Sequence, residues 1–214
     1  MRPDRWAVVA ESDRVQWDCE PLERVGPLRF GMSQRKATAA MDAQGFASDA
    51  SAIANFGPFG QVRVKFRKTE GASGRNGSRK TSFADALEVL LTGSLGQVDV
   101  VAYFVDSIGL TCVAVDARSG PQVTLDGIRL IGRRPSELAN EIAAHLEDTG
   151  KGVEITVDGE VSHSDWGMFP RPQRAGDVLL TRAVFGRPNS WAYTTFDCIP
   201  ADEWKSHRVI ASSG

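Results

Sequence analysis

The stretch Gly26-Pro27-Leu28-Arg29-Phe30-Gly31-Met32-Ser33 decides the fold class, because a similar stretch returns in the second half of the chain. The second copy is Gly127-Ile128-Arg129-Leu130-Ile131-Gly132, followed by Arg133-Arg134-Pro135-Ser136. Each copy combines an apolar-Arg-apolar strand end, a glycine that can turn the chain, and a serine or proline that can start a helix. A repeat with this period favours two similar halves over a single enzyme fold built around one cleft.

A helix is expected after each copy. Ser33 is placed to cap the first helix, and Gly45 to end it. Pro135 suits the first turn of the second helix, over residues 135–147, because that position needs no backbone donor. The apolar faces consist of Ala37, Ala40 and Met41 in the first helix, and of Leu138, Ile142 and Leu146 in the second.

The rest of the chain is mostly short, β-rich runs joined by turns. The runs at residues 98–105, 111–115 and 178–185 are apolar and are bounded by turn residues. Short connections between strands favour antiparallel sheets and therefore an α+β fold. We expect two halves, residues 1–118 and 119–214, each with one main helix on an antiparallel sheet and the two packed as one unit. Residues 82–91 fit either a short helix or a strand.

Composition excludes several classes of protein. The chain has 214 residues, 42% of them hydrophobic, and a net charge of −2, as in an ordinary globular protein. No apolar run is long enough to cross a membrane, and the first residues lack the apolar stretch of a signal peptide. The three cysteines are widely spaced, which suggests reduced thiols and a cytoplasmic location. The three histidines give no metal-binding pattern, and no cofactor is expected.

Two segments superficially suggest catalysis. The glycines of residues 71–81 precede Lys80-Thr81, but Arg79 stands where a phosphate-binding loop requires glycine. Ser162-His163-Ser164-Asp165 contains the residue types of a catalytic triad. Triads, however, are assembled from distant segments, and this one lacks a nucleophile elbow. An enzyme is therefore the less favoured interpretation.

A cationic strand and loop form the first candidate binding surface. In residues 62–67, Val62, Val64 and Phe66 alternate with Arg63, Lys65 and Arg67, which predicts one buried and one basic face. Arg75 and Arg79 continue the positive charge into a glycine-rich loop, where Glu70 is the only acidic residue nearby. We expect these basic side chains to be exposed and clustered, either as a solvated surface or as a site for an acidic protein partner. Nucleic acid fits less well, because aromatic residues that could stack on bases are scarce there.

Loop aromatics form the second candidate surface. Trp166 and Phe169 lie in Asp165-Trp166-Gly167-Met168-Phe169-Pro170, a segment with turn chemistry. Large aromatic residues are enriched at protein interfaces, so both are candidates for contacting a partner. Packing of this loop onto the sheet is the alternative.

The two glycine-containing stretches and their helices resemble the helix-and-sheet unit of the β-lactamase-inhibitor-protein family and of the outer-membrane assembly lipoproteins, in which the helix often starts Gly-Met-[Ser/Thr]. In the inhibitor family, tandem units form one antiparallel sheet that grips a partner enzyme. This chain lacks the signal peptide, lipobox and paired cysteines of those groups. The resemblance therefore implies tandem units, without secretion, disulfides or a particular target.

The function expected from these features is non-catalytic binding of another protein, as in a bacterial cytosolic immunity or inhibitor protein. The alternative is an enzyme or small-ligand-binding protein with its site in the groove between the halves. A deep pocket with a buried carboxylate would favour the alternative, and a shallow sheet edged by arginines would favour the first.

Overall fold

The computed structural model describes residues 6–56, 61–69, 98–155, 159–190, 192–194, 199–200 and 203. For residues 49–56 and 61 it describes the backbone alone. Residues 82–91, for which the sequence left helix and strand open, lie outside this part of the chain.

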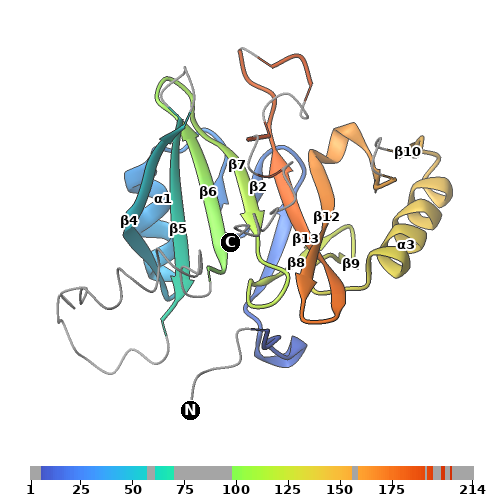
Figure 1. Cartoon of the computed structure of the whole chain (residues 1–214). Coiled ribbons are helices and arrows are strands. Elements are labelled where there is room, and N and C mark those ends of the chain that lie inside the picture. The colour runs from blue at the N-terminus through green and yellow to red at the C-terminus, as the bar shows by residue number, and fades with distance from the viewer. Residues whose placement is uncertain are drawn as a thin grey trace, which may run out of the picture.

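A six-stranded sheet with strand order β12-β13-β7-β6-β5-β4 forms the centre of the molecule (Figure 1). Every neighbouring pair in it is antiparallel. Its strands are β4 (Phe46–Phe56), β5 (Gln61–Lys68), β6 (Val100–Val105), β7 (Gly109–Val115), β12 (Met168–Ala175) and β13 (Val178–Gly186). The β7–β13 pair joins the two expected halves into one continuous sheet.

A second sheet has the order β3-β2-β1-β8-β9. Its short strands are β1 (Gln16–Glu20), β2 (Arg24–Val25), β3 (Leu28–Arg29), β8 (Gln122–Leu125) and β9 (Ile128–Arg129). Its β1–β8 pair is parallel, unlike the antiparallel pairing expected throughout. A further two-stranded sheet pairs β10 (Glu154–Ile155) with β11 (Val161–Ser162). Short 3₁₀ helices are η1 (Glu11–Asp13) and η2 (Ser164–Trp166).

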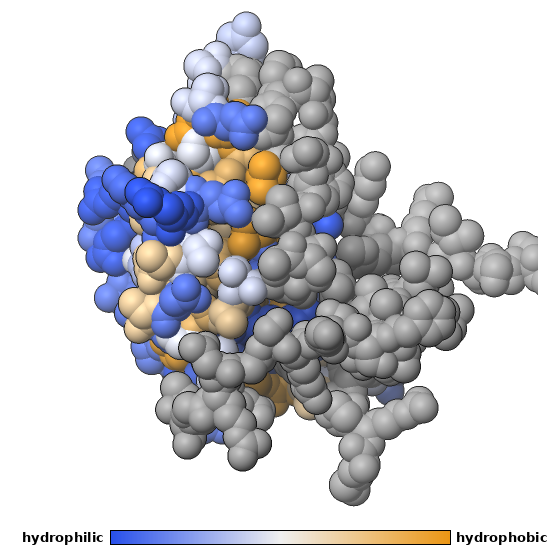
Figure 2. Space-filling view, turned by 90° about the vertical axis from the view of Figure 1, so that its left-hand side faces the viewer, coloured by the Kyte–Doolittle hydropathy of each residue, from blue (hydrophilic) through white to orange (hydrophobic). Residues whose placement is uncertain are grey.

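Helices α1 (Gln34–Ala43) and α3 (Pro135–Asp148) lie where the sequence predicts them. The Ser33 hydroxyl accepts a hydrogen bond from the Lys36 amide at the start of α1, and Pro135 opens α3. In α1, Ala37 and Met41 are buried, whereas Ala40 is only half-buried. The face of α3 formed by Leu138, Ile142 and Leu146 is fully buried, as predicted. The outward side of α1 is hydrophilic (Figure 2).

The main sheet has two apolar faces. Strand register places Val64, Ala102, Val113 and Phe185 in one row across β5, β6, β7 and β13. This first face belongs to the large core that also contains the buried residues of α1 and α3. Phe66 is buried in the same core and Val62 packs against it half-buried, so the alternation predicted for β5 is confirmed. We call the opposite side of the main sheet the second face.

The hairpins that precede the two helices have the same pairing. Val25 pairs with Leu28 in β2–β3, and Leu125 pairs with Ile128 in β8–β9. In each hairpin, the residue that follows the second strand donates its backbone amide to a backbone carbonyl at or just before the first strand. These hydrogen bonds run from Phe30 to the Glu23 carbonyl at 2.9 Å and from Leu130 to the Val123 carbonyl at 3.0 Å.

The glycines before the helices also make matching contacts. Gly31 donates its amide to the Leu110 carbonyl in β7, and Gly132 donates to the Thr181 carbonyl in β13, both at 2.8 Å. Each strand residue donates back to the residue that follows the glycine, at 2.9 and 2.7 Å. Both glycines have positive φ, +82° and +74°, a conformation that glycine adopts readily. The two glycines thus stand in equivalent local contexts, while duplication of the complete halves stays a prediction.

The buried face of α3 makes a testable contribution to stability. Leu138→Ala removes a fully buried side chain and should lower the free energy of unfolding by about 2–5 kcal/mol, because it leaves a cavity. Glu147→Ala on the exposed side of the same helix is the matched control and should change stability by less than about 0.5 kcal/mol. Urea denaturation followed by circular dichroism measures both. A loss for Leu138→Ala no larger than the control's would contradict the packing of this face.

Candidate functional site

An apolar cluster lies on the second face of the main sheet, between basic side chains. Strand register carries the row from Lys65 through Val101, Ala114 and Val184 to Phe169. A second row places Arg63 opposite Tyr103 and Tyr103 opposite Cys112, and Arg182 stands opposite Arg171. The apolar cluster consists of Tyr103, Cys112, Ala114, Phe169, Val184 and Ile199, with Val101 packed against it.

The basic residues of β5 lie on the second face but differ from the expected surface. Arg63, Lys65 and Arg67 are half-buried rather than fully exposed. Asp49 stands opposite Lys65 in the register. Burial raises the pKa of Asp99, and the nearby charge of Arg67 partly offsets that rise. Counting Glu70 as the only nearby acid therefore overstated the local charge imbalance, because Asp99 also lies near Arg67. Arg75 and Arg79 lie outside the described residues.

Trp166 and Phe169 are not surface aromatics. Each is only 1% exposed, so neither can contact a partner in this conformation, and their assignment to a partner surface is corrected. Trp166 lies in η2 and packs into the large core, with Lys151 Nζ 5.9 Å from its ring centroid. Phe169 lies in the buried first part of β12 and belongs to the second-face cluster. The segment packs onto the sheet, as the alternative interpretation holds.

The polar residues beside Trp166 are engaged locally. Ser162 is buried, and its hydroxyl donates to the Met168 carbonyl. His163 Nδ1 accepts a hydrogen bond from the Asp165 amide at 3.1 Å. Ser164 Oγ lies 2.9 Å from Glu154 Oε1. These contacts shape a turn and align no nucleophile with a base.

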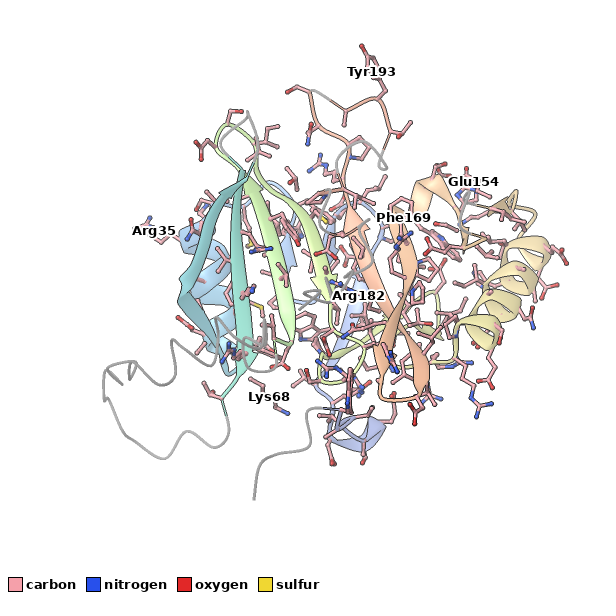
Figure 3. All side chains as sticks on the ribbon, viewed as in Figure 1. Arg35, Lys68, Glu154, Phe169, Arg182 and Tyr193 are labelled. Atoms are coloured by element: carbon pink, nitrogen blue, oxygen red, sulfur yellow. The ribbon has the colours of Figure 1, made fainter. Side chains whose placement is uncertain are left out.

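A C-terminal segment covers the second-face cluster, which the sequence did not predict. Ile199 is buried among the cluster's side chains. Glu203 is 8% exposed; its carboxylate accepts a hydrogen bond from the Tyr103 hydroxyl and lies 2.7 Å from Arg182 Nη2. Figure 3 labels Arg182 and Phe169, which come from the neighbouring strands β13 and β12. No periodicity marks Ile199 and Glu203 in the sequence, so no local signal could have found this contact.

A cavity of about 700 Å³ lies beside the end of β5. Val9, Val15, Phe46 and Pro121 form its apolar walls, and its polar lining consists of Asp13, Arg14, Arg67, Lys68, Thr69, Asp99 and Ser119. Its volume is in the range of small-molecule sites. The N-terminal segment, β4, β5 and residues 119–121 all contribute to it.

Asp99 is the buried carboxylate of this cavity. It is 6% exposed and accepts a hydrogen bond from the Lys68 amide at 2.5 Å. Burial raises the pKa of Asp99, and the nearby charge of Asp116 raises it further, whereas the hydrogen bonds of Ser119 and Lys68 and the charge of Arg67 oppose the rise. These contacts join residues that are far apart in the chain.

In the same cavity, the Arg14 side chain binds backbone carbonyls. Its guanidinium donates to the carbonyls of Gly120, Ala117 and Arg118 at 2.6–2.9 Å. These bonds satisfy the backbone of the connection between β7 and β8, which would otherwise bury unpaired carbonyls. Arg14 therefore shapes the cavity wall.

Metal and thiol chemistry have little support in the described part of the chain. Within it, no group of three or more His, Cys, Asp or Glu side chains could hold a metal ion. Cys19 is a free thiol. Burial raises the pKa of Cys19 to about 12, so this thiol stays protonated and weakly reactive at neutral pH.

Comparison with known proteins leaves the family open. No family model matches the chain, and neither the curated proteins nor the solved structures gave a match. The resemblance to the inhibitor and lipoprotein units therefore stays a prediction. Among the described helices, none is long and apolar enough to cross a membrane.

The raised pKa of Asp99 predicts a pH dependence of stability. An acid whose pKa is higher in the folded than in the unfolded state makes folding less favourable as pH rises from its unfolded pKa through its folded pKa. Asp99→Asn removes this ionisation while keeping an oxygen to accept from the Lys68 amide. Relative to wild type, the variant should therefore gain stability as pH increases from about 4 to about 7.

Chemical denaturation of both proteins across this pH range measures the difference. Asp177→Asn, at a fully exposed carboxylate, is the control for removing one negative charge. A stability difference between Asp99→Asn and wild type that stays constant with pH would show that burial does not raise the pKa of Asp99.

Proposed function

We propose that this chain is a non-catalytic protein-binding module whose partner docks on the second face of the main sheet. The observation that supports this most is that the second-face cluster already accommodates a chain segment through one apolar side chain and one carboxylate. An apolar centre bounded by polar and charged side chains is the arrangement of a protein interface.

The basic residues around the cluster suit an acidic partner. Arg63 and Arg67 lie on one flank, in β5, and Arg171 and Arg182 lie on the other, in β12 and β13. Arg171 forms an ion pair with Glu160 at 2.8 Å, and Arg182 forms one with Glu203 at 2.7 Å. Arginines on this face therefore already bind carboxylates. Arginine is favoured at such positions because its planar guanidinium binds carboxylates in a defined geometry.

In a cytoplasmic setting, this module would act as an immunity or inhibitor protein that blocks a bacterial toxin or enzyme by occupying its surface. The resemblance to tandem inhibitor units supports the assignment by analogy of fold alone. An apolar sheet face bounded by arginines suits recognition of a folded protein.

A small ligand in the cavity beside β5 is the second candidate. The specific observation in its favour is the buried Asp99, with its raised pKa, in a cavity of about 700 Å³. A perturbed carboxylate in a cavity is typical of functional sites. Its oxygens are nevertheless engaged by Lys68 and Ser119, so the second face remains the better-supported site.

The basic flank provides the test. Arg63→Glu combined with Arg67→Gln removes the cations of β5 while avoiding a new negative charge beside Asp99. Both side chains are only half-buried, so the variant should fold, which circular dichroism checks. Association with an acidic partner should weaken at least about tenfold, mainly through a slower encounter whose rate is less sensitive to salt than that of wild type.

The partner is first recovered from the native host with the wild-type chain, identified by mass spectrometry, and then titrated in purified form against each variant. Arg35→Glu with Lys36→Gln on the exposed side of α1 makes the same charge change and is the matched control (Figure 3 labels Arg35). Equal affinities for wild type and the β5 variant would exclude this flank from the interface, and failure of any protein to bind the purified chain would overturn the proposed function.

A further inference from the structure

The second face contains a carboxylate-binding site formed by two residues that are distant in sequence. The Tyr103 hydroxyl comes from β6 and the Arg182 guanidinium from β13, and β7 lies between these strands. Tyr103 is 4% exposed, and the Arg182 side chain is 20% exposed. Both groups converge on Glu203, whose side chain is 4% exposed. A hydroxyl donor and a guanidinium together are a strong site for an ionised carboxylate.

Glu203 fills this site incompletely. Arg182 Nη2 lies 2.7 Å from Glu203 Oε2, which is within ion-pair distance but without the alignment of a hydrogen bond. Arg182 Nε is buried and has no hydrogen-bond partner among the described residues. A guanidinium matches a carboxylate best through two parallel N–H donors. A carboxylate that also reached Nε would therefore make a contact that Glu203 does not make.

An apolar position accompanies the carboxylate site. Ile199 packs into the cluster that includes Ala114, Val184 and Phe169. The Glu203 amide donates to the Pro200 carbonyl at 2.9 Å, so a turn brings the apolar side chain and the carboxylate to the face from one short segment. The second face thus recognises an apolar side chain and an acid about four residues apart in this turn geometry.

We propose that the Tyr103–Arg182 site is where the partner docks an acidic segment of this kind, and that Ile199 and Glu203 of this chain are its intramolecular substitutes. This inference rests on the proposed function and adds the chemistry of the partner: an apolar side chain and a carboxylate presented together on a turn. The partner's carboxylate reaches both Nη2 and Nε of Arg182 and displaces Glu203.

Displacement of Glu203 is feasible because its contact with Arg182 is incomplete. The tether opposes displacement. A tethered segment competes at an effective concentration on the order of millimolar. A partner overcomes that competition when it makes the second Arg182 hydrogen bond, which Glu203 does not make. Partner binding and release of the C-terminal segment are then a single exchange on one surface.

The experiment uses the full chain and a fluorescently labelled peptide of residues 197–206, with serine in place of Cys198. In the chain variant Glu203→Lys, the tethered segment loses its carboxylate and places a positive charge near Arg182. Fluorescence anisotropy should show the peptide binding this variant at least about tenfold more tightly than it binds wild type, whose own Glu203 competes for the site.

Three controls test each part of the site. Glu147→Lys on the exposed side of α3 makes the same charge change away from the second face and should bind the peptide as weakly as wild type. Glutamine at position 203 of the peptide, or Arg182→Met added to the Glu203→Lys chain, should each weaken binding at least about tenfold. If Glu203→Lys fails to fold, as judged by circular dichroism, Glu203→Ala takes its place with the same expectation.

Equal peptide affinity for the Glu203→Lys and Glu147→Lys chains would overturn the inference, as would binding that survives glutamine in the peptide. These outcomes are independent of any partner. If the peptide binds as expected but no protein partner exists, the proposed function fails while the site stands. If a partner is found whose affinity is unchanged by Arg182→Met, the proposed function stands and the inference is wrong.

Discussion

The central strands of the main sheet are apolar on both sides, and this constraint organises the rest of the molecule. In β6 and β7 nearly every residue is buried, whichever face its side chain occupies. A strand of this kind must be covered on both faces, because each face would otherwise expose a continuous apolar surface to water. The helices and the second sheet cover one face. The other face receives a C-terminal segment through Ile199 and Glu203.

The pairing of β7 with β13 extends that constraint across the whole chain. Cys112 pairs with Gly186 and Ala114 with Val184, so the second-face cluster contains residues from both expected halves. The same pairing brings Arg182 within reach of a carboxylate held by Tyr103. A binding surface at this junction therefore depends on the assembled sheet, and neither half contains it alone.

The cavity beside β5 illustrates how buried polar groups are accommodated at the end of the sheet. Arg14 satisfies three carbonyls of the connection after β7. Gly120 in that connection has no room for a side chain, since a Cβ would lie 2.6 Å from the Asp116 carbonyl oxygen. Asp99 ties the end of β5 to the same connection through Lys68 and Ser119. Arg14 and Asp99, two of the polar residues that line the cavity, are therefore engaged in contacts that hold the fold together. For this reason the second face is the stronger candidate site.

The sequence by itself determined the features that depend on near neighbours. Proline and the spacing of Leu138, Ile142 and Leu146 specify α3, and alternation specifies the two sides of β5, because helix and strand periodicities act over a few residues. Only the tertiary structure decided that Trp166 is buried, that Asp99 lies near Arg67, and that Glu203 meets Arg182. These outcomes depend on strand order and on contacts between residues far apart in the chain, which local periodicity does not encode. The candidate site consists almost entirely of such contacts, so the α+β class could be predicted from the sequence while the site could not.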